Sequence, residues 1–289
     1  MLNIYNPTIF APTTSSPHWY VQFHASYYIS QITNNILLSG LDGMAIEAGS
    51  DRKDLGFDER AVVGAENAVS AVIAALHKRP QQIGILLTAM GFEVESSEQG
   101  DVRIDKEKLL HATNCDVWLD VLKGFLNIWE FMFLFSAVES TLKRVLNKVP
   151  DGMGGLLNAV IKENPNFEHV MRKTHFMDRN MFCTFWELFY RVRNMYAHSY
   201  GYLEEADVPL IERYAADFNK SFEKYIGRVS EHSAVQAVME VQDEGFFPAE
   251  GLVVGKFYLI RDVELNLFRN LISQFMFELQ RNAEKSAQL

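Results

Sequence analysis

The stretch FWELFYRVRNMYAHSYGY, residues 185–202, decides the fold of this 289-residue chain. When it is placed on a helix of 100° per residue, its aromatic and aliphatic side chains point in almost every direction. A helix that is apolar nearly all round is buried among other elements. One line along the same helix is polar, and we call it the polar stripe: Asn180, Thr184, Glu187, Arg191, Asn194 and His198.

Helical apolar spacing and helix stop signals extend over most of the remaining chain. We expect helices at about residues 19–38, 61–79, 106–148 (with a break near Asn114), 156–163, 178–200, 207–225, 231–241 and 265–285. A glycine- and charge-rich loop is expected at residues 40–56. Residues 92–104 predict a small hairpin, and residues 252–260 predict one or two short strands. The fold class is therefore mainly α, with an N-terminal α-rich extension (residues 1–105), one or two small β-hairpins, and a helical domain with C-terminal helices (residues 106–289).

Composition limits the classes of function. Hydrophobic residues make up 48% of the chain and aromatic residues 12%, which is typical of a globular protein. A net charge of -10 argues against broad coating of nucleic acid but allows a small basic site. Two cysteines, Cys115 and Cys183, predict no disulfide framework, and residues 1–20 have no signal-peptide pattern. The apolar stretch 124–140 is interrupted by Asn127 and Glu130, so we expect a buried helix, no membrane span and a cytoplasmic protein.

The polar stripe has two interpretations. It is either a buried hydrogen-bond network that fixes the helix, or a site that faces a cleft or a partner. Residues 171–200 contain five basic and two acidic side chains, a local charge of +3 that favours a site. Lys143, Arg144 and Lys148 can extend this basic surface, although their position at a helix end also complements the helix dipole.

Arg193-Asn194-x-x-x-His198 resembles the Arg-x4-6-His motif of the HEPN superfamily (higher eukaryotes and prokaryotes nucleotide-binding). The apolar helix that ends at the histidine and the long helix before it fit that family, so the resemblance covers about residues 115–225. It implies that the helical domain, residues 106–289, is an HEPN-like helical bundle. Tyr200, two residues past His198, is similar to the extended motif of HEPN toxins that pair with nucleotidyltransferase antitoxins.

The resemblance implies a metal-independent endoribonuclease that needs no cofactor and acts as a toxin or in antiviral defence. Two protomers of a homodimer would line one composite site for RNA. His198 would be the general acid and base, Arg193 would bind the scissile phosphate, and Asn194 would orient the imidazole or bind a phosphate oxygen. An antitoxin or nucleotidyltransferase is the further partner that the resemblance implies.

Three residues are expected to assist in substrate binding: Arg191, Tyr200 and Glu139. Helical geometry puts Arg191 about 20° from His198 and Arg193 about 140° away, so Arg191 is the second candidate for the catalytic arginine. Glu139 is also expected to pair with Lys143 at i+4. Tyr200 either accepts AMP from a nucleotidyltransferase or simply closes the helix before Gly201. The alternative function is a non-catalytic HEPN-like binding or scaffold protein.

Overall fold

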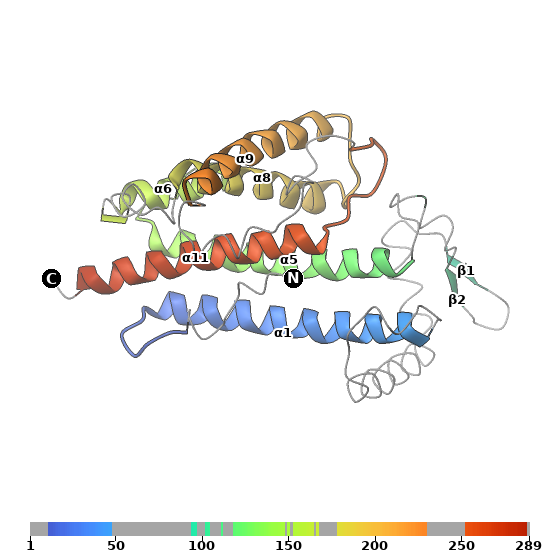
Figure 1. Cartoon of the computed structure of the whole chain (residues 1–289), viewed down its shortest axis with the longest axis horizontal. Helices are drawn as coiled ribbons and strands as arrows, with labels where there is room; N and C mark the ends of the chain where they lie inside the picture. The colour runs from blue at the N-terminus through green and yellow to red at the C-terminus, as the bar shows by residue number, and fades with distance from the viewer. Residues whose placement is uncertain are drawn as a thin grey trace.

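A computed structural model gives the fold. It describes residues 11–47, 94–96, 102–104, 111, 118–147, 149–150, 153–164, 166–167, 178–229 and 252–287. The long helices run roughly along the longest axis of the molecule in three tiers (Figure 1). Helix α1 forms one tier, α5 and α11 lie in the middle, and α6, α8 and α9 form the third.

The described part of the chain is mainly α-helical, which confirms the fold class at that level. Its elements are α1 (His18–Glu47), β1 (Val94–Ser96), β2 (Val102–Ile104), α5 (Trp118–Val145), the 3-10 turn η2 (Met153–Gly155), α6 (Leu156–Glu163), α8 (Arg179–His198), α9 (Val208–Val229) and α11 (Asp262–Ala287). At the position of the expected hairpin, β1 and β2 pair antiparallel with Val94 opposite Ile104.

One boundary was predicted wrongly. The loop expected from Gly40 is wrong for residues 40–47, because α1 continues through Gly40 and Gly43 to Glu47. A glycine inside a helix costs only about 1 kcal/mol relative to alanine, and the good helix formers around these two offset that cost. The helices expected at 61–79 and 231–241 lie outside the described residues. The division at residue 105 stays a prediction, because most of residues 48–117 lie outside the described residues too.

Aromatic side chains from α5, α8 and α11 meet in the core. Phe135 of α5 stacks on Trp186 of α8, with ring centroids 4.5 Å apart. The ring centroid of Phe268 on α11 lies 5.0 Å from that of Phe131 and 5.0 Å from that of Phe189. Such aromatic pairs add roughly 0.5–1.5 kcal/mol each beyond the area they bury. They hold α8, which carries the polar stripe, against the middle tier.

Helix α1 joins this core through one face. Tyr20, Phe23 and Tyr27 are buried at helical spacing, and Ser30 and Asn34 continue the same line as buried polar residues. The Tyr27 hydroxyl donates to the backbone carbonyl of Arg269 at 3.1 Å, which ties α1 to α11.

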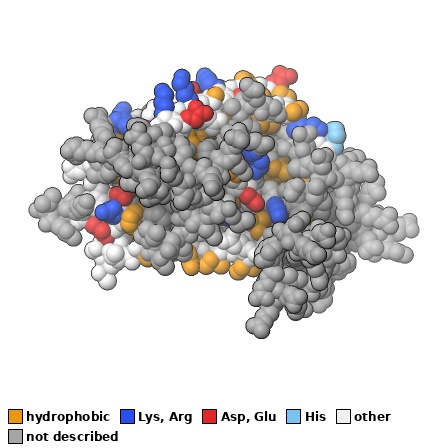
Figure 2. All heavy atoms as spheres, viewed as in Figure 1, with side chains coloured by type: hydrophobic (Ala, Val, Ile, Leu, Met, Phe, Trp, Pro, Cys, Tyr) orange, Lys and Arg blue, Asp and Glu red, His pale blue; other side chains and the backbone are white. Residues whose placement is uncertain are grey.

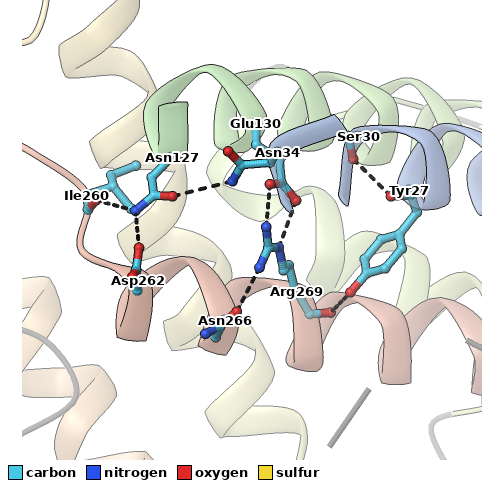
Figure 3. A network of polar contacts seen from close by, with 9 residues as sticks. All are labelled: Tyr27, Ser30, Asn34, Asn127, Glu130, Ile260, Asp262, Asn266 and Arg269. Carbon is cyan, nitrogen blue, oxygen red and sulfur yellow. Dashed lines mark hydrogen bonds and ion pairs between the residues drawn. The ribbon is translucent and has the colours of Figure 1, made fainter. Parts of the chain in front are cut away.

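A buried polar network links α1, α5 and α11 (Figure 3). The Arg269 guanidinium donates from Nε to Oε1 of Glu130 at 2.7 Å, and its Nη2 contacts the second carboxylate oxygen. Asn127 donates to the carbonyl of Ile260 at 3.0 Å. The two polar residues that interrupt the apolar stretch of α5 are thus paired inside the core, as buried polar groups must be.

Among the described helices, α5 includes a stretch, Val121–Val145, that is long and apolar enough to cross a membrane. Its side chains Phe131 and Phe135 are buried in the core described above. The core helix of a soluble protein meets the same criterion, so this feature is weak evidence for membrane insertion.

Candidate functional site

Helix α8 has a defined beginning and end. Asp178 caps its first turn, since the side-chain oxygen accepts from the backbone N–H of Met181 at 2.8 Å. The last helical residue is His198, and Ser199 follows as the C-cap. Tyr200 and Gly201 then adopt left-handed backbone conformations with φ of 53° and 88°. This change of backbone conformation ends α8, so His198 lies in its last turn.

The segment that precedes α11, residues 252–260, contacts the residues that follow the end of α8. Residues 252–260 were predicted as one or two strands, and an isolated antiparallel bridge between Tyr202 and Phe257 is found there. The backbone N–H of Tyr258 donates to the carbonyl of Gly201 at 2.9 Å, and that of Leu203 donates to Lys256 at 2.9 Å. A Cβ atom on Gly201 would lie 2.5 Å from the Phe257 ring, so only glycine fits at this position.

The first half of the polar stripe faces α9. Asn180 donates to the hydroxyl of Ser221 on α9 at 2.8 Å. Burial raises the pKa of the Glu187 carboxyl, as does the nearby Asp217, while Arg213 of α9 opposes this shift. The interpretation as a structural polar network therefore holds for this half of the stripe.

The motif residues Arg193 and Asn194 have surroundings that differ from those of the first half of the stripe. Arg193 donates from Nη1 to the Oδ1 atom of Asn194 at 3.0 Å. Its Nη2 atom lies 4.0 Å from Oε2 of Glu139 on α5, and the other oxygen of Glu139 accepts from Lys143 at 2.6 Å. The expected pair of Glu139 with Lys143 is thus present. Two cations share one largely buried carboxylate, so this end of α8 keeps a positive balance.

Arg144 and Lys148 were also candidates for the basic surface at the end of the long helix. Arg144 contacts the side-chain oxygen of Gln22 on α1, so it is directed toward the first tier. Lys148 lies outside the described residues. Of the two described basic residues at the end of α5, Lys143 shares Glu139 with Arg193, whereas Arg144 does not.

His198 is exposed, and within the described residues its imidazole has no hydrogen-bond or ion-pair partner. Arg193 points toward α5, on a side of α8 that differs from the side of His198 by about 140° on an ideal helix. Arg191 lies within about 20° of His198 and is half-buried. One protomer thus brings Arg193, Asn194 and Glu139 together and leaves His198 one turn further along.

A buried cluster under the motif was not predicted from the sequence. The hydroxyl of Tyr196 donates to the carbonyl of Tyr258 at 2.7 Å. Glu264 of α11 binds Arg261 through its side chain at 2.8 Å, and burial raises the pKa of Glu264 despite that arginine. Burial also raises the pKa of both tyrosines well above the ordinary value. The cluster anchors the last turn of α8 to the start of α11.

Chemistry that depends on a metal or a reactive thiol finds little support in the described part of the chain. No three His, Cys, Asp or Glu side chains gather there into a set that could hold a metal ion. Burial raises the pKa of the Cys183 thiol to about 11, against the lowering effect of Arg179. Such a thiol is protonated near neutral pH and is a poor nucleophile.

No protein-family model matches this chain, and neither a curated protein nor a solved structure gives a match. The resemblance to the HEPN superfamily therefore rests on the motif residues and the helical pattern around them in the sequence.

Proposed function

We propose that this protein is a metal-independent endoribonuclease of the HEPN type. The observation that carries the proposal is the end of α8, where Arg193 and Asn194 form one hydrogen-bonded unit and His198 lies one turn further with an exposed imidazole. A guanidinium supplies fixed donors for a phosphate, and an imidazole exchanges protons near neutral pH.

The reaction needs only these groups. The 2′-hydroxyl of a ribose attacks the adjacent phosphorus and loses its proton to a base, while the bond from phosphorus to the 5′-oxygen breaks and that oxygen gains a proton. The products are a 2′,3′-cyclic phosphate and a 5′-hydroxyl. Because the attack is intramolecular, positioning and charge stabilisation provide most of the catalysis. His198 transfers the proton and Arg193 stabilises the charge on the phosphate.

A homodimer accounts for the separation of the two groups around the helix. Within one chain, Arg193 is directed to α5 and His198 is exposed at the end of α8. A two-fold arrangement of two α8 helices would let the arginine of one protomer act beside the histidine of the other. Mixing His198→Ala chains with Arg193→Ala chains tests this arrangement, since a composite site recovers activity in mixed dimers.

The proposal is tested by cleavage of a labelled RNA by the purified protein. We expect His198→Ala and Arg193→Ala each to lower the rate by at least about 100-fold, the usual contribution of one acid–base or oxyanion-stabilising group. Arg191→Ala distinguishes the second candidate arginine. Arg281→Ala, which removes an exposed cation of α11 that pairs with Glu278, serves as the matched control and should cleave normally. Undiminished cleavage by both motif variants would refute the proposal.

A second candidate function is a non-catalytic binding or scaffold role. It is favoured by exposed apolar side chains on α1: Val21, Tyr28, Ile29, Ile32, Ile36 and Leu37. Figure 2 shows hydrophobic side chains on the surface at its lower edge. Exposed apolar faces of this kind commonly mark contacts with another protein. A stable dimer that cleaves none of a broad set of RNAs would support this role.

The biological setting that we infer is a toxin or antiviral defence protein in the cytoplasm, with an antitoxin or nucleotidyltransferase as a possible partner. This setting rests on the resemblance of Arg193, His198 and Tyr200 to the toxin motif. Growth arrest on expression of the wild-type chain, and its loss with His198→Ala, is the expected result in cells.

A further inference from the structure

Tyr200 combines backbone strain with exposure. Its φ of 53° makes it the one non-glycine residue with a positive φ in the described part of the chain, and its side chain is 78% exposed. A bulky residue in this conformation is less stable than glycine, which adopts it freely. Fold stability alone therefore does not explain a tyrosine here.

The surrounding contacts force this conformation. The N–H of Ser199 donates to the carbonyl of Met195 at 2.8 Å, and the N–H of Tyr202 donates to the carbonyl of Ser199 at 2.9 Å. Gly201 is held on the other side by Phe257 and by the hydrogen bond from Tyr258. Strained residues persist where neighbouring structure over-determines them, and they concentrate at functional sites.

The Tyr200 ring adds no ring stacking and no hydrogen bond to the described part of the chain. No aromatic ring stacks on it there, and its hydroxyl makes no hydrogen bond with a described residue. By contrast, the neighbouring Tyr196 and Tyr202 are in contact with Phe257 at centroid distances of 6.3 Å and 5.5 Å. Tyr200 is a flat apolar surface on a rigid turn, presented to solvent.

We infer that Tyr200 is a stacking platform for an unpaired nucleobase, so that the substrate is single-stranded RNA. This inference rests on the proposed function. Two residues of chain span at most about 7 Å, so the Tyr200 backbone lies close to that of His198. A base next to the scissile phosphate can then stack on the ring while the phosphate contacts the motif. Bases inside a duplex are stacked on one another and cannot take this position.

The experiment measures binding and cleavage separately. Binding of a short, labelled, non-self-complementary RNA is followed by fluorescence anisotropy in the His198→Ala background, where proposed cleavage does not interfere. Tyr200→Phe, which keeps the ring, should bind within about twofold of the parent. Tyr200→Gly and Tyr200→Leu should bind about 5- to 150-fold more weakly, the range that loss of one stacked base produces. The same RNA annealed to its complement should bind all four proteins equally.

Stability gives an independent readout. Because glycine adopts a positive φ without strain, Tyr200→Gly should unfold at the same temperature as the parent or higher, even though it binds RNA more weakly. A general loss of structure would instead lower both the unfolding temperature and the affinity for RNA. The combination of weaker binding with unimpaired stability is specific to a residue that serves the ligand.

Two results would overturn the inference. One is unchanged binding of single-stranded RNA by Tyr200→Gly and Tyr200→Leu. The other is dissociation of a dimer by these variants in sedimentation, in parallel with their loss of binding, which would assign the ring to a contact between protein chains. Failure of the proposed function gives a different result: if RNA binds in a Tyr200-dependent way but the wild-type chain, with His198 in place, does not cut it, the ribonuclease is contradicted and the stacking platform is not.

Discussion

Removing one member of the buried ion pair between Glu130 and Arg269 should destabilise the whole helical core. The side chain of Glu130 is fully buried and that of Arg269 is 8% exposed, and two contacts join them. Glu130→Ala leaves a guanidinium in the core without its main partner, which costs about 3–5 kcal/mol. Since a domain of this kind is stable by roughly 5–15 kcal/mol, the loss is a large share of the total.

A double variant separates the cost of leaving one buried charge unpaired from the cost of losing the ion pair. The double variant Glu130→Leu with Arg269→Met replaces both charges by apolar side chains, and its stability should return to within about 1–2 kcal/mol of wild type. A matched surface control is Glu278→Ala, because Glu278 pairs with Arg281 at 3.1 Å where the two side chains are 25% and 48% exposed. This control should change stability by less than about 1 kcal/mol.

Urea unfolding followed by circular dichroism measures all four proteins. The midpoint should fall strongly for Glu130→Ala, recover in the double variant and stay nearly constant for Glu278→Ala, with similar slopes throughout. A Glu130→Ala midpoint as close to wild type as that of Glu278→Ala would refute the reasoning. So would a double variant that is no more stable than Glu130→Ala.

Three further predictions concern the elements around the motif. Asp178→Ala removes the acceptor for the N–H of Met181 and should cost about 0.5–2 kcal/mol in thermal or urea unfolding, whereas Asp178→Ser should retain most of the stability. Gly201→Ala places a methyl group 2.5 Å from the Phe257 ring at a φ of 88°, so unfolding should show a loss of about 2–4 kcal/mol; a loss below 0.5 kcal/mol, within about the noise of surface changes, would contradict the geometry. Burial raises the pKa of Glu264, so the folded state binds a proton more readily than the unfolded state, and stability falls as pH rises through the raised pKa. Glu264→Gln lacks this dependence, so its stability relative to wild type should rise as the pH increases above 4.5, the ordinary pKa of a glutamate, and a constant difference would argue against a shifted carboxyl.

The helices with explicit start and stop signals were predictable from the sequence. Helix α6 has the bounds expected, and α8 begins and ends within two residues of the expected positions. In α8 the signals are Asp178 at the start and Gly201 at the end, and each acts through a local backbone contact. The end of α1 differs from the prediction, because the expected loop at residues 40–56 overlaps the last part of a helix that continues through Gly40 and Gly43 to Glu47.

Contacts between distant segments were not predictable. Asn127 and Glu130 were seen to interrupt the apolar stretch of α5, but the sequence around a residue does not show which distant side chain lies next to it. The partner of Glu130, Arg269, is 139 residues away in the sequence. The same limit applies to α8, where the first half of the polar stripe faces α9, while Arg193, which lies outside the stripe, reaches toward Glu139 on α5.

The sequence predicted which residues make up the candidate site and their order along the helix. It did not predict how their side chains lie relative to one another. The sequence placed Arg193, Asn194 and His198 on one helix, and it left open which arginine lies beside the histidine. In the structure Arg193 belongs with Asn194 and Glu139, and Arg191 remains nearer to His198 in direction around the helix. The strained conformation of Tyr200 had no sequence signal, because it results from the bridge between Tyr202 and Phe257.

The most direct test of the account is the chemistry of the cut ends. Total RNA is incubated with the purified protein in the presence of a chelator, and the products of wild type and His198→Ala are compared. We predict fragments with 2′,3′-cyclic phosphate and 5′-hydroxyl ends from the wild type and almost none from the variant. Intact RNA with the wild type, or equal cleavage by His198→Ala, would contradict the assignment of a ribonuclease site to the end of α8.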